Sequence, residues 1–340
     1  MAQICGSEHG AALFRSGWSA YRQPQGASSM SAIAEAGAPR RTARSRFTAF
    51  DRLEVLGPLF IIPAILYVVV LVGLPFLLAL YYSVSAYSIF NPSWTFVGLK
   101  NFREVIDSEI FRRTLANTLI FTISAQIIGL LLGKIGAMLL MQEFPGRRLA
   151  RALIVLPWAV PVSLATLAWV WMFDSLYSVI NWTLLAAGLI DPAHRPQWLG
   201  QEDLAMIAVA TVHAWRLFPF GVVIFLAGFT SVPQDVLDAA TIDGAGFWRR
   251  NYQIILPIIA PIIMIALIFG TVFTFTDLSV VYLLTKGGPI NSTQVLGTLA
   301  FQVGILSGDV AHGAAICLFL FPFLLVAVIL LLRSLRRREI

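Results

Sequence analysis

Long apolar stretches recur along the chain, and short segments between them carry most of the polar residues. A transmembrane helix needs about 20 predominantly apolar residues, because backbone polar groups in lipid must be satisfied inside the helix. Six stretches meet this requirement and predict one span each: residues 57–82, 114–141, 152–173, 204–229, 258–284 and 313–332. The pattern predicts an all-α integral membrane protein with six transmembrane helices.

Some parts of this pattern are less regular. The second stretch contains Lys134 and the fourth contains Arg216. Pro157 and Pro161 predict a kink near the start of the third span, because proline lacks the N–H that a helix uses. Residues 176–190 are apolar but too short to cross a membrane. We expect them to lie at the membrane interface or to fold back as part of a loop.

Composition supports a membrane protein. Of the 340 residues, 58% are hydrophobic and 12% are charged, whereas about a quarter of the residues of a soluble domain are charged. Residues 1–52 differ from the rest: they are rich in Ala, Ser, Gly and Arg and show no periodicity. This predicts a disordered basic leader, followed by a six-helix membrane domain over residues 53–340.

Lys and Arg are distributed unevenly between the two ends of the predicted spans. One side carries fourteen of them and the opposite side six. Because cytoplasmic flanks are enriched in Lys and Arg, the first side is predicted to be cytoplasmic, and both termini lie on it. The bias also explains the net charge of +6, which therefore gives no support to nucleic-acid binding.

A polar segment, residues 231–257, separates the fourth and fifth spans on the predicted cytoplasmic side. Ser231 and Gln234 have the spacing of a capping box, and Pro233 suits a first helical turn, so a helix is predicted to begin here. Gly244 predicts its end, because glycine readily takes the left-handed conformation that closes a helix.

The side chains of this segment suit contact with another protein. The carboxylates of Asp238 and Asp243 could pair with cations on a partner. Ala239 and Ala240 have almost no side chain, so they would let a partner's backbone approach closely.

The order of residues in this segment resembles the EAA loop of binding-protein-dependent ABC importer permeases. Asp238-Ala239-Ala240 is followed after three residues by Gly244, and after nine more by Ile254-x-Leu256-Pro257. The family usually has Glu where this chain has Asp238, so the carboxylate is kept on a shorter arm. Three further segments are similar to the carbohydrate branch of the family, which includes the maltose and glycerol-3-phosphate permeases: FVGLKNF (96–102), LPWAVP (156–161) and YLLTKGGPINST (282–293).

This resemblance implies a type I ABC importer permease fold in which the EAA segment is a cytoplasmic coupling helix that docks on an ATPase. The residues that it implies for coupling are Asp238, Ala239, Ala240, Asp243, Gly244, Ile254, Leu256 and Pro257. It also implies that a sugar, oligosaccharide or polyol crosses the bacterial cytoplasmic membrane by alternating access. The implied partners are a second permease subunit, expected to be a different chain, an ATPase dimer that binds ATP and magnesium, and a periplasmic or lipid-anchored solute-binding protein.

Ionisable groups inside spans are functional candidates, because burying them in a membrane is costly. Arg216 and Asp277 are the two best examples here. An alignment anchored at the EAA loop to the larger maltose permease subunit implies these substrate-pathway positions: His213, Arg216, Leu217, Phe220, Gly270, Thr274 and Asp277. None of them repeats the residue type of that subunit, so the location of the site transfers and the identity of the substrate does not.

Arg216 leaves two interpretations open. A guanidinium binds carboxylate and phosphate in a fork, which would suit an anionic sugar derivative such as a uronic-acid oligomer or glycerol-3-phosphate. Alternatively, Arg216 and Asp277 form a structural pair between helices, because buried charges require partners.

Other functional classes have less support. Gly129 to Lys134 is one residue short of a phosphate-binding loop, and Ile135 stands where Ser or Thr is needed, so no ATPase site is expected on this chain. Gly129 and Gly133 instead predict a helix-packing face, and Lys134 is predicted to snorkel to the interface or to line a polar cavity. The histidines are scattered along the sequence and predict neither a metal site nor a catalytic group. An ion-driven carrier would leave the EAA loop unexplained, and no internal repeat supports one.

Overall fold

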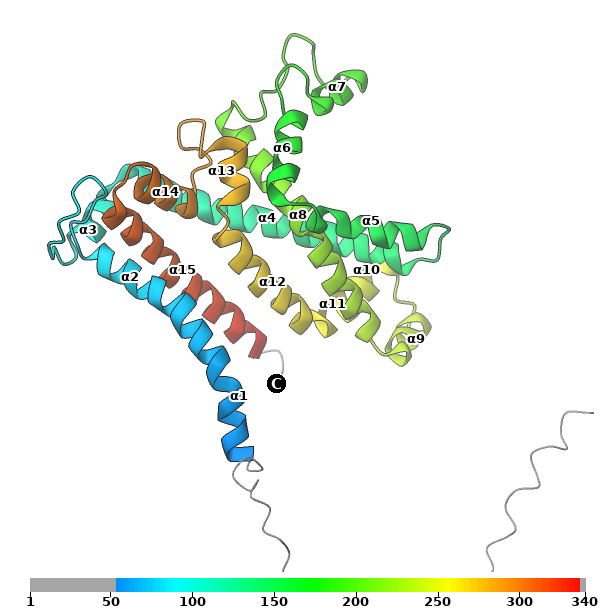
Figure 1. Ribbon diagram of the computed structural model, residues 1–340. Helices are drawn as coiled ribbons and strands as arrows, with labels where there is room; N and C mark the ends of the chain where they lie inside the picture. Colours follow the sequence, from blue (N-terminus) through cyan, green and yellow to red (C-terminus); the bar gives the residue numbers. More distant parts are fainter. Residues whose placement is uncertain (1–52, 337–340) are drawn as a thin grey trace, which may run out of the picture. The chain divides into compact units, whose positions relative to one another are not determined.

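The computed structural model describes residues 53–336, and helices are the only extended regular elements in this range (Figure 1). The all-α prediction is therefore confirmed. The predicted leader, residues 1–52, lies outside the described residues. The chain divides into Met1–Pro63 and Ala64–Ile340, and the packing described below is that of the second unit.

The helices of the described range follow one another in this order: α1 (Leu53–Val68), η1 (Val69–Gly73), α2 (Leu74–Ser83), α3 (Lys100–Asp107), α4 (Glu109–Met141), α5 (Arg147–Ala159), α6 (Val162–Met172), α7 (Val179–Ala186), α8 (Glu202–Ser231), α9 (Gln234–Ile242), α10 (Phe247–Arg249), η2 (Arg250–Ile255), α11 (Leu256–Ile258), α12 (Ala260–Phe275), α13 (Ser279–Thr285), α14 (Leu296–Phe301), η3 (Gln302–Leu306) and α15 (Val310–Arg336).

Four helical runs in the described range are long and apolar enough to cross a membrane alone: Phe60–Ser83, Glu109–Met141, Glu202–Ser231 and Val310–Leu335. They correspond to the first, second, fourth and sixth predicted spans. Each of the four is a continuous helical run, unlike the two that follow.

The third and fifth spans are broken. Helices α5 and α6 meet at 97°, and Pro161, just before α6, lies at the break. The predicted kink is present, but it lies in the middle of the span. The helical run Phe247–Ile258 meets α12 at 71°, where Pro261 in the first turn of α12 cannot donate an N–H to the preceding turn.

The fifth span also ends earlier than the sequence predicts. Helix α12 ends at Phe275, and a separate helix, α13, follows after a short turn. Asp277 in this turn accepts the backbone N–H of Val280 at 2.9 Å, so its carboxylate caps the first turn of α13. The predicted stretch 258–284 is therefore two helices rather than one.

Helices α4 and α8 pack closely along their glycines. A Cβ on Gly133 would come within 2.8 Å of the Gly221 Cα, and one on Gly221 would come within 3.1 Å of the Gly129 carbonyl oxygen. The predicted packing face of Gly129 and Gly133 is confirmed, because the two helix backbones approach each other there and leave no room for a Cβ at Gly133.

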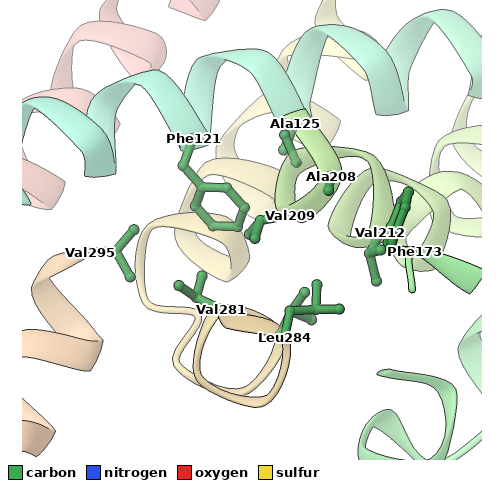
Figure 2. Packing of buried hydrophobic residues seen from close by; sticks show 11 residues of the cluster. Phe121, Ala125, Phe173, Ala208, Val209, Val212, Val281, Leu284 and Val295 are labelled. Atoms are coloured by element: carbon green, nitrogen blue, oxygen red, sulfur yellow. The ribbon is translucent and has the colours of Figure 1, made fainter. Parts of the chain in front are cut away.

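Apolar side chains join these two helices to α13. Phe121 of α4, Val209 and Val212 of α8, and Val281 and Leu284 of α13 belong to one buried cluster (Figure 2). This cluster positions the turn before α13, and therefore Asp277, beside α8.

Helix α7 has eight residues, about 12 Å, which confirms that the region around 176–190 is too short to span a membrane.

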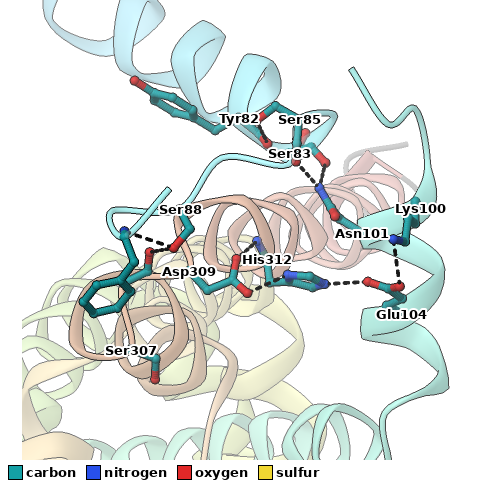
Figure 3. A network of polar contacts seen from close by, with 12 residues as sticks. Tyr82, Ser83, Ser85, Ser88, Lys100, Asn101, Glu104, Ser307, Asp309 and His312 are labelled. Carbon is teal, nitrogen blue, oxygen red and sulfur yellow. Dashed lines mark hydrogen bonds and ion pairs between the residues drawn. The ribbon is translucent and has the colours of Figure 1, made fainter. Parts of the chain in front are cut away.

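Polar contacts hold α3 against the neighbouring helices. Asn101 of α3 donates to the Ser83 and Ser85 carbonyl oxygens at 2.8 and 2.7 Å. His312 of α15 lies between the carboxylates of Asp309 and Glu104, so α3 is tied to both α2 and α15 (Figure 3).

Candidate coupling segment and substrate pathway

The short helix predicted after the fourth span is α9, but it begins without a capping box. Ser231 is the last residue of α8, and its hydroxyl donates to the Gly228 carbonyl oxygen at 2.7 Å. Pro233 occupies the N-cap position, and the Gln234 amide donates to the Asp238 carboxylate at 3.0 Å instead of reaching back. The capping-box prediction is wrong because α8 continues as far as Ser231.

The end of α9 agrees with the prediction. Gly244 has a left-handed backbone with φ of +66°, and the Ala245 N–H donates to the Ala240 carbonyl oxygen at 2.9 Å. A Cβ on Gly244 would meet no heavy atom within 4 Å, so the position requires glycine for its backbone conformation and not for space.

Helix α9 has one face against its own chain and one free face. Ala240 is only 4% exposed, and Leu237 packs against the apolar cluster at the ends of α4 and α8. Ala240 therefore exposes little of its own side chain, and its contact with a partner stays a prediction. Asp238 and Ala239 are exposed, and so is Ile242 at 86%. Ile242 was not among the residues predicted from the sequence, although it lies one helical turn after Ala239.

The other predicted coupling residues differ in their exposure. Asp243 and Pro257 are exposed, and Ile254 is half-buried. Leu256 packs against the same apolar cluster as Leu237. A hollow of about 390 Å³ beside α9 has Ala239, Ala240 and Ile254 in its lining and the carboxylates of Asp235 and Asp243 among its polar groups.

A polar cluster connects α8 with the end of α12. The Thr274 hydroxyl donates to the Gly270 carbonyl oxygen at 2.7 Å. It lies 3.0 Å from His213 Nε2, so it accepts the N–H of that ring. His213 Nδ1 has no hydrogen-bond partner in the described part of the chain, and it lies 3.6 Å from Asp277 Oδ2.

Arg216 and Asp277 contact each other, as the interpretation of a pair between helices expects. Arg216 Nη1 lies 3.3 Å from Asp277 Oδ2. The Asp277 side chain is 7% exposed and that of Arg216 is 30% exposed, so the carboxylate is enclosed while part of the guanidinium stays accessible. The Asp277 carboxylate thus accepts hydrogen bonds from the Arg216 guanidinium of α8 and from the Val280 N–H of α13.

The seven predicted pathway positions separate into two groups. Arg216, Leu217 and Phe220 are half-buried on α8, and the Phe220 ring packs edge-on against Trp158 and Phe269. His213, Gly270, Thr274 and Asp277 are buried within the chain. They do not line an open path in this conformation.

Gly270 is covered by Gln126 of α4, whose amide donates to the Leu267 carbonyl oxygen at 3.0 Å. Gln126 was not among the residues predicted from the sequence. A glutamine within an apolar span is the signal that could have indicated it.

Lys134 does not belong to a phosphate-binding loop. Residues 129–134 lie inside α4, and Lys134 Nζ lies 4.1 Å from the centroid of the Tyr252 ring. Within residues 53–336, no three His, Cys, Asp or Glu side chains are arranged to hold a metal ion.

Known proteins resemble this chain over most of its length. The trehalose/maltose transport system permease protein MalF of Thermococcus litoralis is 33% identical over 84% of this chain and 95% of its own length. The sn-glycerol-3-phosphate transport system permease protein UgpA of Yersinia pestis is 31% identical over 76% of this chain and 87% of its own length.

A solved structure and a family description agree on the fold. A chain of a bacterial ABC transporter involved in import of the acidic polysaccharide alginate matches 84% of this chain and 96% of its own length, with a TM-score of 0.70 and 21% identity. Residues 126–339 match the family described as the binding-protein-dependent transport system inner membrane component. With the EAA spacing and the broken spans in view, we conclude that the chain belongs to this family and is a transmembrane subunit of an ABC importer.

Proposed function

We propose that this subunit imports a sugar, oligosaccharide or polyol across the cytoplasmic membrane by alternating access. A second permease subunit, expected to be a different chain, would complete the pathway. A periplasmic or lipid-anchored binding protein would deliver the solute, and an ATPase dimer would bind ATP and magnesium. The names of the relatives support this class of substrate, because they include trehalose, maltose and glycerol-3-phosphate transport systems.

Helix α9 is proposed to be the contact with the ATPase. The observation that carries this proposal is the division of α9 into two faces: Leu237 packs against the transmembrane helices and Ala240 is buried, while Asp238, Ala239 and Ile242 are exposed. Because α9 follows α8 directly and leads through the EAA loop to α12, a force applied to it would reach both pathway helices.

The test is a pair of glycine substitutions. Gly244→Ala must hold an alanine at φ of +66°, which costs about 1–2 kcal/mol and favours an altered end of α9. The matched control is Gly246→Ala, because Gly246 has φ of −64° and open space around its Cβ position. The complex is purified through a tag on this chain, and copurifying proteins are identified by mass spectrometry.

The expected result is an ATPase that copurifies with the unaltered chain and with Gly246→Ala, and about tenfold less of it with Gly244→Ala. Transport in reconstituted vesicles should fall in parallel. If the ATPase is retained equally by both variants and transport is unchanged, α9 is not the coupling contact. Recovery of the chain alone, still transporting, would also contradict the proposal.

An anionic sugar derivative is the second candidate substrate. The exposed part of the Arg216 guanidinium favours it, because Asp277 engages only one of its nitrogens. The pairing itself favours a neutral substrate, since Asp277 already compensates the charge of Arg216. We therefore propose the neutral sugar first.

A further inference from the structure

A groove on the membrane-embedded part of the chain combines apolar walls with a single charged side chain. It lies between α4, α8, the η2–α11 segment and α12, and its volume is about 490 Å³. Nine of the eleven residues that line it are apolar, and the other two are Lys134 and Tyr252. An apolar groove of this kind suits a hydrocarbon chain, and its one cation requires a separate explanation.

Lys134 lies seven residues before the end of α4 at Met141, about 10 Å along the helix axis. Its ammonium contacts the face of Tyr252 at 4.1 Å. Among the described residues it forms no ion pair with a carboxylate. A ring face leaves the N–H donors of the ammonium free, so the charge can still bind an anion.

Aromatic residues around Tyr252 indicate the level of this lysine in the membrane. The Trp248 ring stacks on Tyr252 at 5.7 Å between ring centroids, and Phe247 packs edge-on against Trp248. All three are at least half-exposed, with Trp248 at 69%. Exposed aromatic rings gather where headgroups meet acyl chains. Arg249 and Arg250 lie in the same stretch and raise the positive potential there.

The groove extends from this level towards the middle of the membrane. On one wall, beyond the bend after Ile258, it follows α12 from Ala260 to Leu267, seven residues or about 10 Å. Leu130 and Leu131 form the opposite wall on α4. This length suits the first part of one acyl chain, with the lysine at the end where a headgroup would lie.

We propose that this groove binds one anionic phospholipid, with its phosphate on Lys134 and an acyl chain between α4 and α12. Charge complementarity distinguishes this occupant from an apolar helix of the second permease, which would leave the ammonium uncompensated in a dry site. Leu256 and Pro257 line the same groove. If the proposed function holds, the lipid therefore also supports the end of the coupling segment.

The experiment measures lipid retention and does not depend on transport. The purified complex, containing the full chain, is exchanged into detergent with either phosphatidylglycerol or phosphatidylcholine, and bound lipid is counted by native mass spectrometry. Lys134→Gln removes the charge and keeps most of the side chain, while Lys134→Arg keeps the charge. Lys100→Gln is the matched control, because Lys100 is an exposed lysine of α3 that pairs with Glu104.

The proposal predicts phosphatidylglycerol on the unaltered complex, on Lys134→Arg and on Lys100→Gln, and about tenfold less on Lys134→Gln. Phosphatidylcholine should be retained less by the unaltered complex. Equal retention of phosphatidylglycerol by Lys134→Gln and the control would overturn it. So would a crosslink in native membranes between a photoactivatable residue placed at Leu267 and the second permease subunit, because a protein helix would then fill the groove.

Discussion

At the scale of single residues, Asp277 holds together three elements. Its carboxylate contacts Arg216 from α8 and the Val280 N–H of α13, and it lies at the end of α12. A carboxylate that is 7% exposed is stable only if these partners remain in place. The polar cluster therefore stabilises the packing of α8, α12 and α13, and it is also a candidate part of the substrate pathway.

Removing one charge of the pair should be worse than removing both. Arg216→Gln leaves the Asp277 carboxylate enclosed without its cation, and Asp277→Asn leaves Arg216 unpaired but keeps an oxygen for the Val280 N–H. We expect each single variant to lower the free energy of unfolding by about 2 kcal/mol, less than for a fully buried pair because Arg216 is 30% exposed. The double variant should recover most of this loss. Thermal unfolding of the purified complex measures the coupling between the two positions.

Uptake by the same variants distinguishes the two substrate classes. If the pair is structural and the solute is a neutral sugar, the double variant transports it and assembles normally. If Arg216 binds an anionic solute, the double variant assembles and loses uptake of that anion. A double variant that is as unstable as the singles would refute the structural pair.

The charged pair could be predicted from the sequence, but the burial of Gly270 and Ala240 could not. Arg216 and Asp277 attract attention because ionisable groups in apolar helices are rare. The burial of Gly270 under Gln126 depends on a contact between α4 and α12, which are far apart in the sequence. Ala240 is buried although the segment around it is polar. No local pattern around Gly270 or Ala240 indicates this burial.

At the scale of elements, hydropathy identifies helices by length and does not register their bends. The unbroken spans were predicted within a few residues, whereas the third and fifth contain bends of 97° and 71°. Pro161 indicated a kink but not its angle, which depends on the helices packed around it. The turn after Phe275 was hidden inside an apolar run. Its one signal was Asp277, a good helix-capping residue.

The crossing of α4 and α8 provides a test at this scale. Gly133→Ala would drive a Cβ to within 2.8 Å of the Gly221 backbone, so the helices must separate. We expect a loss of about 2 kcal/mol in unfolding free energy, typical of overpacking. Gly129→Ala on the same helix is the control, because its Cβ would lie 3.9 Å from the nearest atom, the Ala214 carbonyl oxygen.

Gly129→Ala should be neutral or slightly stabilising, since alanine favours a helix by up to about 1 kcal/mol. Thermal unfolding of the purified complex, followed by tryptophan fluorescence, compares the two variants. Equal effects would mean that the helices do not approach most closely at Gly133.

At the scale of the whole molecule, α8 relates the coupling segment to the polar cluster. Its thirty residues are about 45 Å long, and Arg216 lies near the middle, fourteen residues from Glu202 and fifteen from Ser231. Helix α9 begins three residues after Ser231. The candidate pathway therefore lies at mid-depth of a helix whose end is joined directly to the proposed ATPase contact.

This arrangement makes a prediction about membrane sides. One spanning helix, α8, separates Trp182 of α7 from Thr241 of α9, so the two residues must face opposite aqueous compartments. Both side chains are exposed. In a chain whose native cysteines, Cys5 and Cys317, are replaced by alanine, Trp182→Cys should react with an impermeant maleimide added outside intact spheroplasts. Thr241→Cys should react only in inverted vesicles, because the excess of Lys and Arg assigns α9 to the cytoplasm. Labelling of both from one side would contradict the single crossing by α8, and a reversed pattern would contradict the proposed orientation and with it the contact between α9 and a cytoplasmic ATPase.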